Sequence, residues 1–152
     1  MTRGDARELA VHLIYSQSFT DEEPDKLVAF RLDKAYYTQL SGENEIYQDR
    51  PSRGQVAYID QVVTGVSNRL EELNSQIGKF SIGWDVSRIS RLARAIMQLA
   101  IFEILYVEDV PTGVAVSEAV RLAKKYDGGD TGSFVNGILG SFARSLDAEE
   151  VK

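Results

Sequence analysis

Apolar residues recur every three or four positions along most of this chain, and the clearest case is the stretch 89–107. This spacing is typical of side chains that share one face of a helix. Further apolar residues, among them Met97 and Phe102, spread the apolar surface almost all the way round. A helix that is apolar on most sides has to be covered by other helices. We therefore expect 89–107 to be the central helix of a helical bundle.

One polar residue of this stretch, Glu103, falls among apolar neighbours. A carboxylate buried without partners is unfavourable, so we expect hydrogen-bond donors close to it. The free backbone amides of the helix that follows Pro111 are the expected donors. The alternative is that Glu103 reaches the rim of the bundle and is solvated. We assign Glu103 a structural role.

The first half of the chain shows three further helical patterns. The first covers 2–19, and its histidine, His12, is expected on the surface. The second covers 25–40, after a proline that suits the first turn of a helix. Ser52-x-x-Gln55 is a capping-box pattern, and it precedes a long amphipathic helix that ends at Gly78.

The second half continues after the central helix with two more patterns, over 114–126 and 134–146. Between them, 127–132 reads as a glycine-rich loop in which Asp130 or Thr131 caps the last helix. This loop has no Gly-Lys-Ser/Thr continuation and follows no strand, which excludes a nucleotide P-loop. With no strand pattern of any length, the predicted fold class is all-α, in two packed helical subdomains over 1–78 and 79–152.

Composition narrows the function classes. The 152 residues are 43% hydrophobic, which excludes wholesale disorder, and there is no cysteine. One histidine and no nucleophile–base motif leave little material for catalysis, so we expect a non-enzymatic protein without a metal or cofactor. Charged residues interrupt the N-terminus and the central helix, so we expect a cytoplasmic protein rather than a membrane protein. The net charge of −6 argues against strong non-specific binding of nucleic acid, although a local basic patch stays open.

Several separated motifs occur in a specific order that covers nearly the whole chain. They are Ala6–Tyr15, Trp84 with Arg88–Ile89, Ala95–Ile104, Val110–Pro111, Val116–Tyr126 and Ser133–Leu139. This ordered set resembles the NusB family of transcription antitermination factors. The stretch 20–52 and the polar tail match less well.

The resemblance implies a fold of about seven helices in two subdomains and a role in RNA binding. NusB proteins bind single-stranded boxA RNA in nascent transcripts, above all ribosomal RNA leaders. They do so with a small-subunit ribosomal protein, NusE, and the pair helps RNA polymerase in the antitermination complex to read through terminators. We therefore expect this chain to have the same partners.

The resemblance also assigns residues. The RNA-binding set is Arg3, Arg7, Tyr15, Lys125, Asp130 and Phe134, and the candidate contacts to the ribosomal protein are Arg94 and Gln98. Guanidinium groups suit phosphates, and aromatic rings suit unstacked bases. Without the resemblance, the two N-terminal arginines also fit a solvated helix edge, Asp130 fits a helix cap, and Phe134 fits the core.

The chain departs from the family pattern in three features. Gly4 and Asp5 interrupt the N-terminal arginine cluster, Gln98 stands where an arginine is common, and Ser117 stands where asparagine is usual. Together with a pI of about 4.8, the first two predict weak RNA binding by the protein alone.

Two other hypotheses remain. One is a helical module that binds only protein or self-associates, for example as a homodimer through its amphipathic helices. The other is the NusB-like domain that accompanies ribosomal RNA cytosine methyltransferases, which we disfavour because no methyltransferase sequence follows Lys152.

Overall fold

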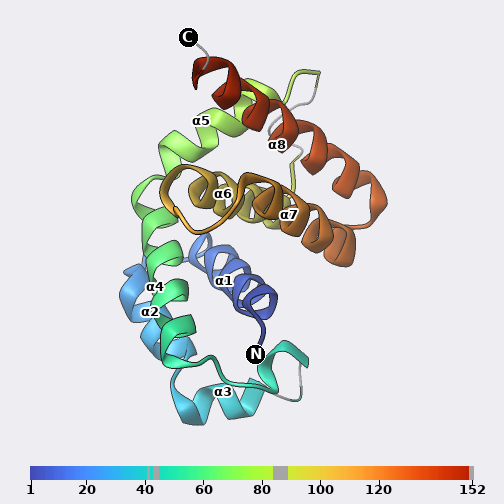
Figure 1. The fold of residues 1–152 in the computed structure, drawn as a ribbon. Helices are drawn as coiled ribbons and strands as arrows, with labels where there is room; N and C mark the ends of the chain where they lie inside the picture. The colour runs from blue at the N-terminus through green and yellow to red at the C-terminus, as the bar shows by residue number, and fades with distance from the viewer. Residues whose placement is uncertain (41, 43–44, 84–88, 151–152) are drawn as a thin grey trace. The chain divides into compact units, whose positions relative to one another are not determined.

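The computed structural model describes residues 1–40, 42, 45–83 and 89–150, with side chains through 148. Within these ranges the chain forms eight α-helices, one short 3₁₀ helix and no strand, which confirms the all-α class (Figure 1). The chain divides into two compact units, Met1–Asn68 and Arg69–Lys152, whereas we predicted a boundary after Gly78. None of the described helices is both long and apolar enough to cross a membrane.

Unit 1 is built around α4 (Arg53–Asn68), against which α1 (Arg3–Gln17) and α2 (Pro24–Arg31) both pack. Its smaller elements are α3 (Lys34–Leu40) and η1 (Glu45–Tyr47). The predicted capping box of α4 is confirmed, since the Gln55 amide donates to Ser52 Oγ at 3.2 Å and the Ser52 amide donates to Gln55 Oε1 at 2.8 Å.

The single helix that we predicted over 25–40 is wrong, because the chain forms α2 and α3 there. Pro24 does occupy the first turn of α2, as predicted. Asp33 separates the two helices: its carbonyl accepts from the Tyr37 amide at 2.8 Å and its carboxylate accepts from the Tyr36 amide at 3.3 Å. A short polar side chain that binds nearby amides in this way starts a new helix.

The predicted helix up to Gly78 is also two helices, α4 and α5 (Leu70–Phe80). Arg69 lies between them with φ −126° and ψ 22°, outside the helical region. The apolar spacing continues across this break because both helices bury one face. Periodicity therefore did not reveal it.

Unit 2 is a bundle of α5, α6 (Arg91–Tyr106), α7 (Thr112–Asp127) and α8 (Gly129–Glu150). The central helix is confirmed: α6 buries nearly every residue from Ala93 to Glu103 and packs against each of the other three helices. Ser90 caps it, since its Oγ accepts from the Ala93 amide at 3.0 Å. The motif residues Trp84 and Arg88 lie outside the described residues.

The glycine-rich loop that we predicted over 127–132 is wrong. Only Gly128 separates α7 from α8, and its φ of +92° is one that side-chain-bearing residues rarely adopt. A Cβ on Gly132 would lie 2.5 Å from Lys124 Cγ, so glycine lets the two helices approach closely. Asp130 thus lies in the first turn of α8 instead of capping it, and α8 continues past Leu146 to Glu150.

Candidate functional site

The two N-terminal arginines occupy different environments on α1. Arg3 is exposed, and its guanidinium carbon lies 4.6 Å from the centroid of the Tyr58 ring on α4. This cation–π contact orients the side chain at the surface. Arg7 is only 4% exposed, and its neighbour Glu8 is buried as well. The two guanidinium groups therefore do not share the exposed edge that the sequence pattern indicated, because α1 is covered on more than its apolar face.

An aromatic pair lies at the other end of α1. Tyr15 is exposed, as an RNA-facing residue should be, and its ring meets Phe19 edge to face with centroids 5.0 Å apart. Sequence reasoning missed Phe19, which is 58% exposed just beyond the last helical turn. A large apolar ring exposed to this degree beside a second ring offers a surface on which a base can stack.

His12, which we predicted at the surface of the same helix, is half-buried. Its Nδ1 lies 3.0 Å from the Tyr47 hydroxyl of η1, a partner far away in sequence. The histidine is therefore part of the packing of unit 1.

In unit 2 the structure brings Asp130 and Phe134 together on one face of α8. Both line a groove whose other wall includes Phe80 and Ile82. Sequence reasoning missed Phe80 and Ile82. The structure shows that Ile82, beside Gly83, is 86% exposed. The groove thus combines two aromatic rings, two isoleucine side chains and a carboxylate.

This combination suits a nucleobase better than a phosphate. Aromatic rings stack on bases of any kind, whereas the Asp130 carboxylate repels phosphate and accepts hydrogen bonds from base amino groups. Ser133 and Ser141, which also line the groove, add hydroxyl donors. Phe134 is half-buried, so its alternative role as a core residue and its role as groove wall are compatible.

Lys125 is exposed near the end of α7, and its Nζ lies 5.5 Å from the centroid of the Tyr126 ring. The six predicted RNA-binding residues are thus divided between the units: Arg3, Arg7 and Tyr15 belong to unit 1, and Lys125, Asp130 and Phe134 belong to unit 2. Each unit supplies at least one exposed cation and one aromatic ring.

The two candidate contacts to a protein partner lie on α6. Gln98 is only 6% exposed, and its amide donates to Asn74 Oδ1 of α5 at 2.8 Å. The side chain therefore joins two helices of unit 2, which is a structural role that we did not predict. Arg94 is half-buried one turn earlier.

Glu103 is fully buried, so the alternative in which it is solvated at the rim is wrong. Its helix packs directly against α7, the helix that follows Pro111. The burial agrees with a structural role, and the identity of its donors remains our prediction.

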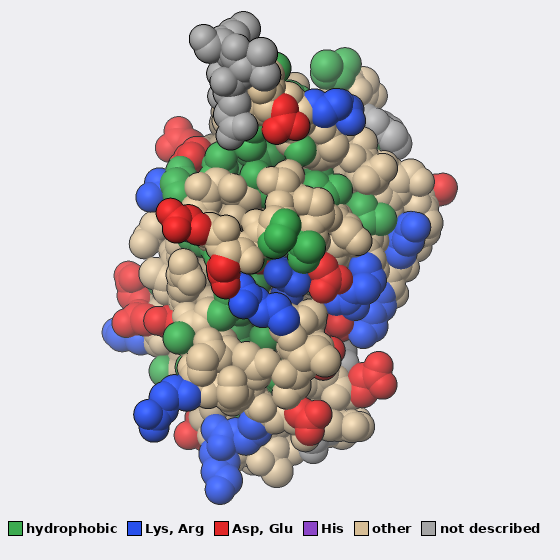
Figure 2. Space-filling view, viewed as in Figure 1, with side chains coloured by type: hydrophobic (Ala, Val, Ile, Leu, Met, Phe, Trp, Pro, Cys, Tyr) green, Lys and Arg blue, Asp and Glu red, His purple; other side chains and the backbone are tan. Residues whose placement is uncertain are grey.

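Charge is mixed over the surface. Figure 2 shows acidic and basic side chains interspersed on the face in view, in keeping with the net charge of −6. Among the described residues, no group of three or more histidine, aspartate and glutamate side chains could hold a metal ion. The features of these residues that could bind a ligand are therefore the aromatic side chains and the isolated charged side chains beside them.

Two small helical bundles on one chain, each with exposed aromatic and charged side chains, define a two-unit all-α binding protein. The chain belongs to the NusB family, whose model matches residues 4–144. The NusB transcription antitermination protein of Acetivibrio thermocellus is 38% identical over 95% of this chain and 90% of its own length. That of Symbiobacterium thermophilum is 36% identical over 96% of this chain and 92% of its own.

Solved structures show the same fold. Thermotoga maritima NusB superposes with a TM-score of 0.77 at 24% identity, over 95% of this chain and 92% of that one. A second solved structure with this fold is a crystal structure of antitermination factors NusB and NusE in complex with double-stranded RNA. A chain of that complex matches with a TM-score of 0.72 at 22% identity, over 94% of this chain and 96% of its own.

Proposed function

We propose that this protein is an RNA-binding transcription antitermination factor. The observation that carries the proposal is family membership over nearly the whole chain, with relatives of that name at 36–38% identity. Exposed Tyr15 and Phe19 in unit 1 and half-buried Phe134 in the groove of unit 2 give that membership a chemical basis, because single-stranded RNA is recognised largely by stacking of its bases.

Each surface has its own part in the proposal. Arg3 and Lys125 are exposed cations that suit phosphates, and Tyr15 with Phe19 forms a stacking surface. The groove of Asp130 and Phe134 receives a base. Arg7 is buried, so we propose that it supports α1 and does not contact phosphate in this conformation.

We further propose that the RNA is a boxA-type single strand in nascent ribosomal transcripts. A small-subunit ribosomal protein of the NusE type binds together with this protein. The two proteins act on RNA polymerase in the antitermination complex. The complex of NusB and NusE with double-stranded RNA, whose NusB-type chain shares this fold, supports RNA and a NusE-type protein as partners. The acidic net charge also favours a basic ribosomal protein as partner.

The test is a titration of labelled single-stranded boxA RNA across a range of salt concentrations. Arg3→Ala should weaken binding to every sequence and reduce the slope of log affinity against log salt by roughly 0.7, the value for one single-strand phosphate. Phe134→Ala should cost about 1–3 kcal/mol of binding free energy with little change in slope, because stacking releases no counterions.

Lys34→Ala is the matched control, since it removes an exposed cation from α3, outside both surfaces. The Phe134 variant is compared only if its circular dichroism spectrum and unfolding midpoint match those of the parent. If the protein sediments as a homodimer or binds the ribosomal protein, and Arg3→Ala and Phe134→Ala leave RNA binding unchanged, the protein-interaction module becomes the better account.

A further inference from the structure

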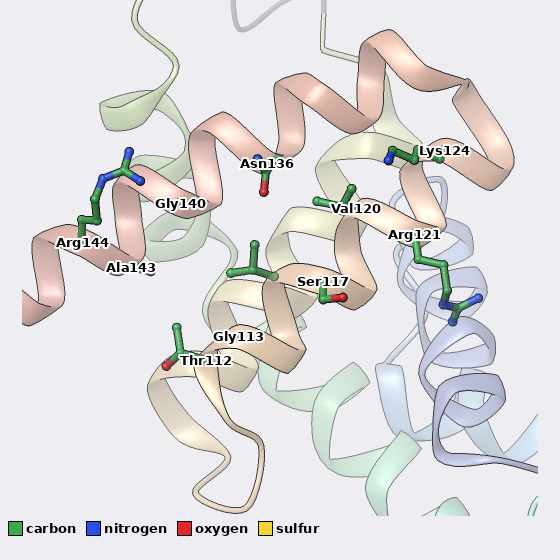
Figure 3. Close-up of a pocket in the computed structure, with 11 residues that line it drawn as sticks. Thr112, Gly113, Ser117, Val120, Arg121, Lys124, Asn136, Gly140, Ala143 and Arg144 are labelled. Atoms are coloured by element: carbon green, nitrogen blue, oxygen red, sulfur yellow. The ribbon is translucent and has the colours of Figure 1, made fainter.

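A second groove of unit 2 lies between α7 and α8 and has no part in the proposed RNA surface. Its lining combines the apolar side chains of Val116, Val120 and Ala143 and two glycines with polar residues such as Asn136 (Figure 3). Figure 3 shows Val120 and Asn136 facing each other across it. The cavity volume is about 800 Å³, which is room for several side chains.

This groove lies on a different side of α8 from the groove of Asp130 and Phe134. With 3.6 residues per turn, Asn136 and Ala143 project roughly 100° or more around the helix axis from that pair. The two grooves also have no lining residue in common. A ligand can therefore occupy one without filling the other.

The charges at this groove have one sign. Arg144 lies at one end and Lys124 at the other, with Arg121 beside Lys124 at the same end (Figure 3). Arg121 is held by Glu118 through a 2.5 Å ion pair, but no carboxylate belongs to the lining itself. In a chain of net charge −6, an apolar groove with cations at both ends is an exception to the general charge balance.

We propose that this groove docks an acidic, partly apolar peptide segment of a partner protein. Apolar side chains of the segment bury against Val116, Val120 and Ala143, and its carboxylates reach Arg144 at one end and Lys124 at the other. A row of phosphates would leave the apolar floor uncovered. An uncharged apolar segment would leave the two cations without counter-charges, so an acidic segment fits the lining best.

The charge requirement is tested with a short fluorescein-labelled peptide of alternating leucine and glutamate pairs, followed by fluorescence anisotropy at low salt. The parent protein should bind it, and the same peptide with glutamine for glutamate should bind much more weakly. Lys124→Gln with Arg144→Gln removes both charges and keeps the side-chain stems, and it should weaken binding roughly five- to tenfold. Lys26→Gln with Lys34→Gln makes the same change of charge on α2 and α3 and should have no such effect.

The shape requirement is tested with Gly113→Leu. A Cβ on this exposed residue of α7 meets no atom within 4 Å, and the residue lines the groove, so a larger side chain there should take up space in the groove. Its unfolding midpoint should equal or exceed that of the parent, because leucine favours a helix more than glycine does, while peptide binding is lost. Affinity for single-stranded RNA should not change in Gly113→Leu, which keeps every charge, and this separates the inference from the proposed function.

Three results would overturn the inference. One is failure of the parent to bind the acidic peptide, and another is equal binding by the parent and Gly113→Leu. The third is loss of RNA binding in Gly113→Leu, which would assign this groove to nucleic acid.

Discussion

Glu103 shows at the scale of one residue what burial of a charge requires. Its side chain is fully buried on the most enclosed helix of unit 2, so the carboxyl group itself has no access to water. Glu103→Ala should lower the free energy of unfolding by roughly 1–3 kcal/mol, because it leaves those donors unsatisfied. Urea unfolding measures this, with Glu108→Ala on the exposed turn as the matched control. Equal free energies of unfolding for the two variants would show that Glu103 does not stabilise the fold.

Tyr37 gives unit 1 a pH-dependent contribution to stability. Its hydroxyl shares one proton between the carbonyls of Asp49 at 2.6 Å and Ile46 at 3.1 Å, and burial raises its pKa from 10.0 to about 12. The folded state thus favours the neutral phenol. That stabilisation is complete below the ordinary pKa of 10 and is lost as the pH rises through about 12.

Tyrosinate absorbance during an alkaline titration should therefore include a step near pH 12 that is later than the ionisation of an exposed tyrosine. Tyr37→Phe should remove this step and cost roughly 1–3 kcal/mol of stability at neutral pH, since two carbonyls lose the donor that they share. If the late step persists in the variant, it belongs to another tyrosine.

At the scale of the element, the turn between α7 and α8 depends on a single backbone conformation. Gly128→Ala should lower the free energy of unfolding by roughly 1–2 kcal/mol, because alanine is strained at a φ of +92°. Gly137→Ala is the control: a Cβ there meets nothing within 4 Å, and alanine within α8 should stabilise the protein by up to about 1 kcal/mol. Thermal unfolding of both variants should move the midpoint in opposite directions.

The elements that could be predicted from the sequence are those with local signals. The capping box at Ser52 and the apolar periodicity of α6 both act within a few residues, so they are visible in the chain itself. The breaks at Asp33 and Arg69 were missed because the apolar spacing continues on either side of them. The start of α8 was missed because Gly128, Gly129 and Asp130 are residues typical of turns, so this stretch was interpreted as a loop. Of these three residues, only Gly128 has an unusual φ.

The candidate site was predictable only in part for a related reason. The chemical types of Tyr15 and Phe134 are visible in the sequence, and the structure leaves both on a surface or groove. The burial of Arg7 and Gln98 was not visible, because it depends on which other elements cover their helices. Phe19 stayed hidden since exposure of an apolar ring is a property of tertiary structure.

For the whole molecule, the charge balance sets the conditions for RNA binding. A net charge of −6 opposes the approach of a polyanion, and only a few exposed cations lie on the proposed surfaces. We predict weak affinity for boxA RNA alone and a gain of about tenfold or more when the basic ribosomal protein is added. Titrations with and without that protein, at matched salt, measure the difference. No gain on its addition would contradict the proposed division of labour between the two proteins.

The glycine turn between α7 and α8 also has a consequence for the order in which unit 2 assembles. Two long helices joined by one residue make contacts between residues close in sequence, so little chain entropy is lost in bringing them together (Figure 1). This pair should therefore form early, with α5 and α6 packing onto it afterwards. In stopped-flow measurements Gly128→Ala should accordingly slow folding, while Ala100→Asp on α6 should mainly speed unfolding.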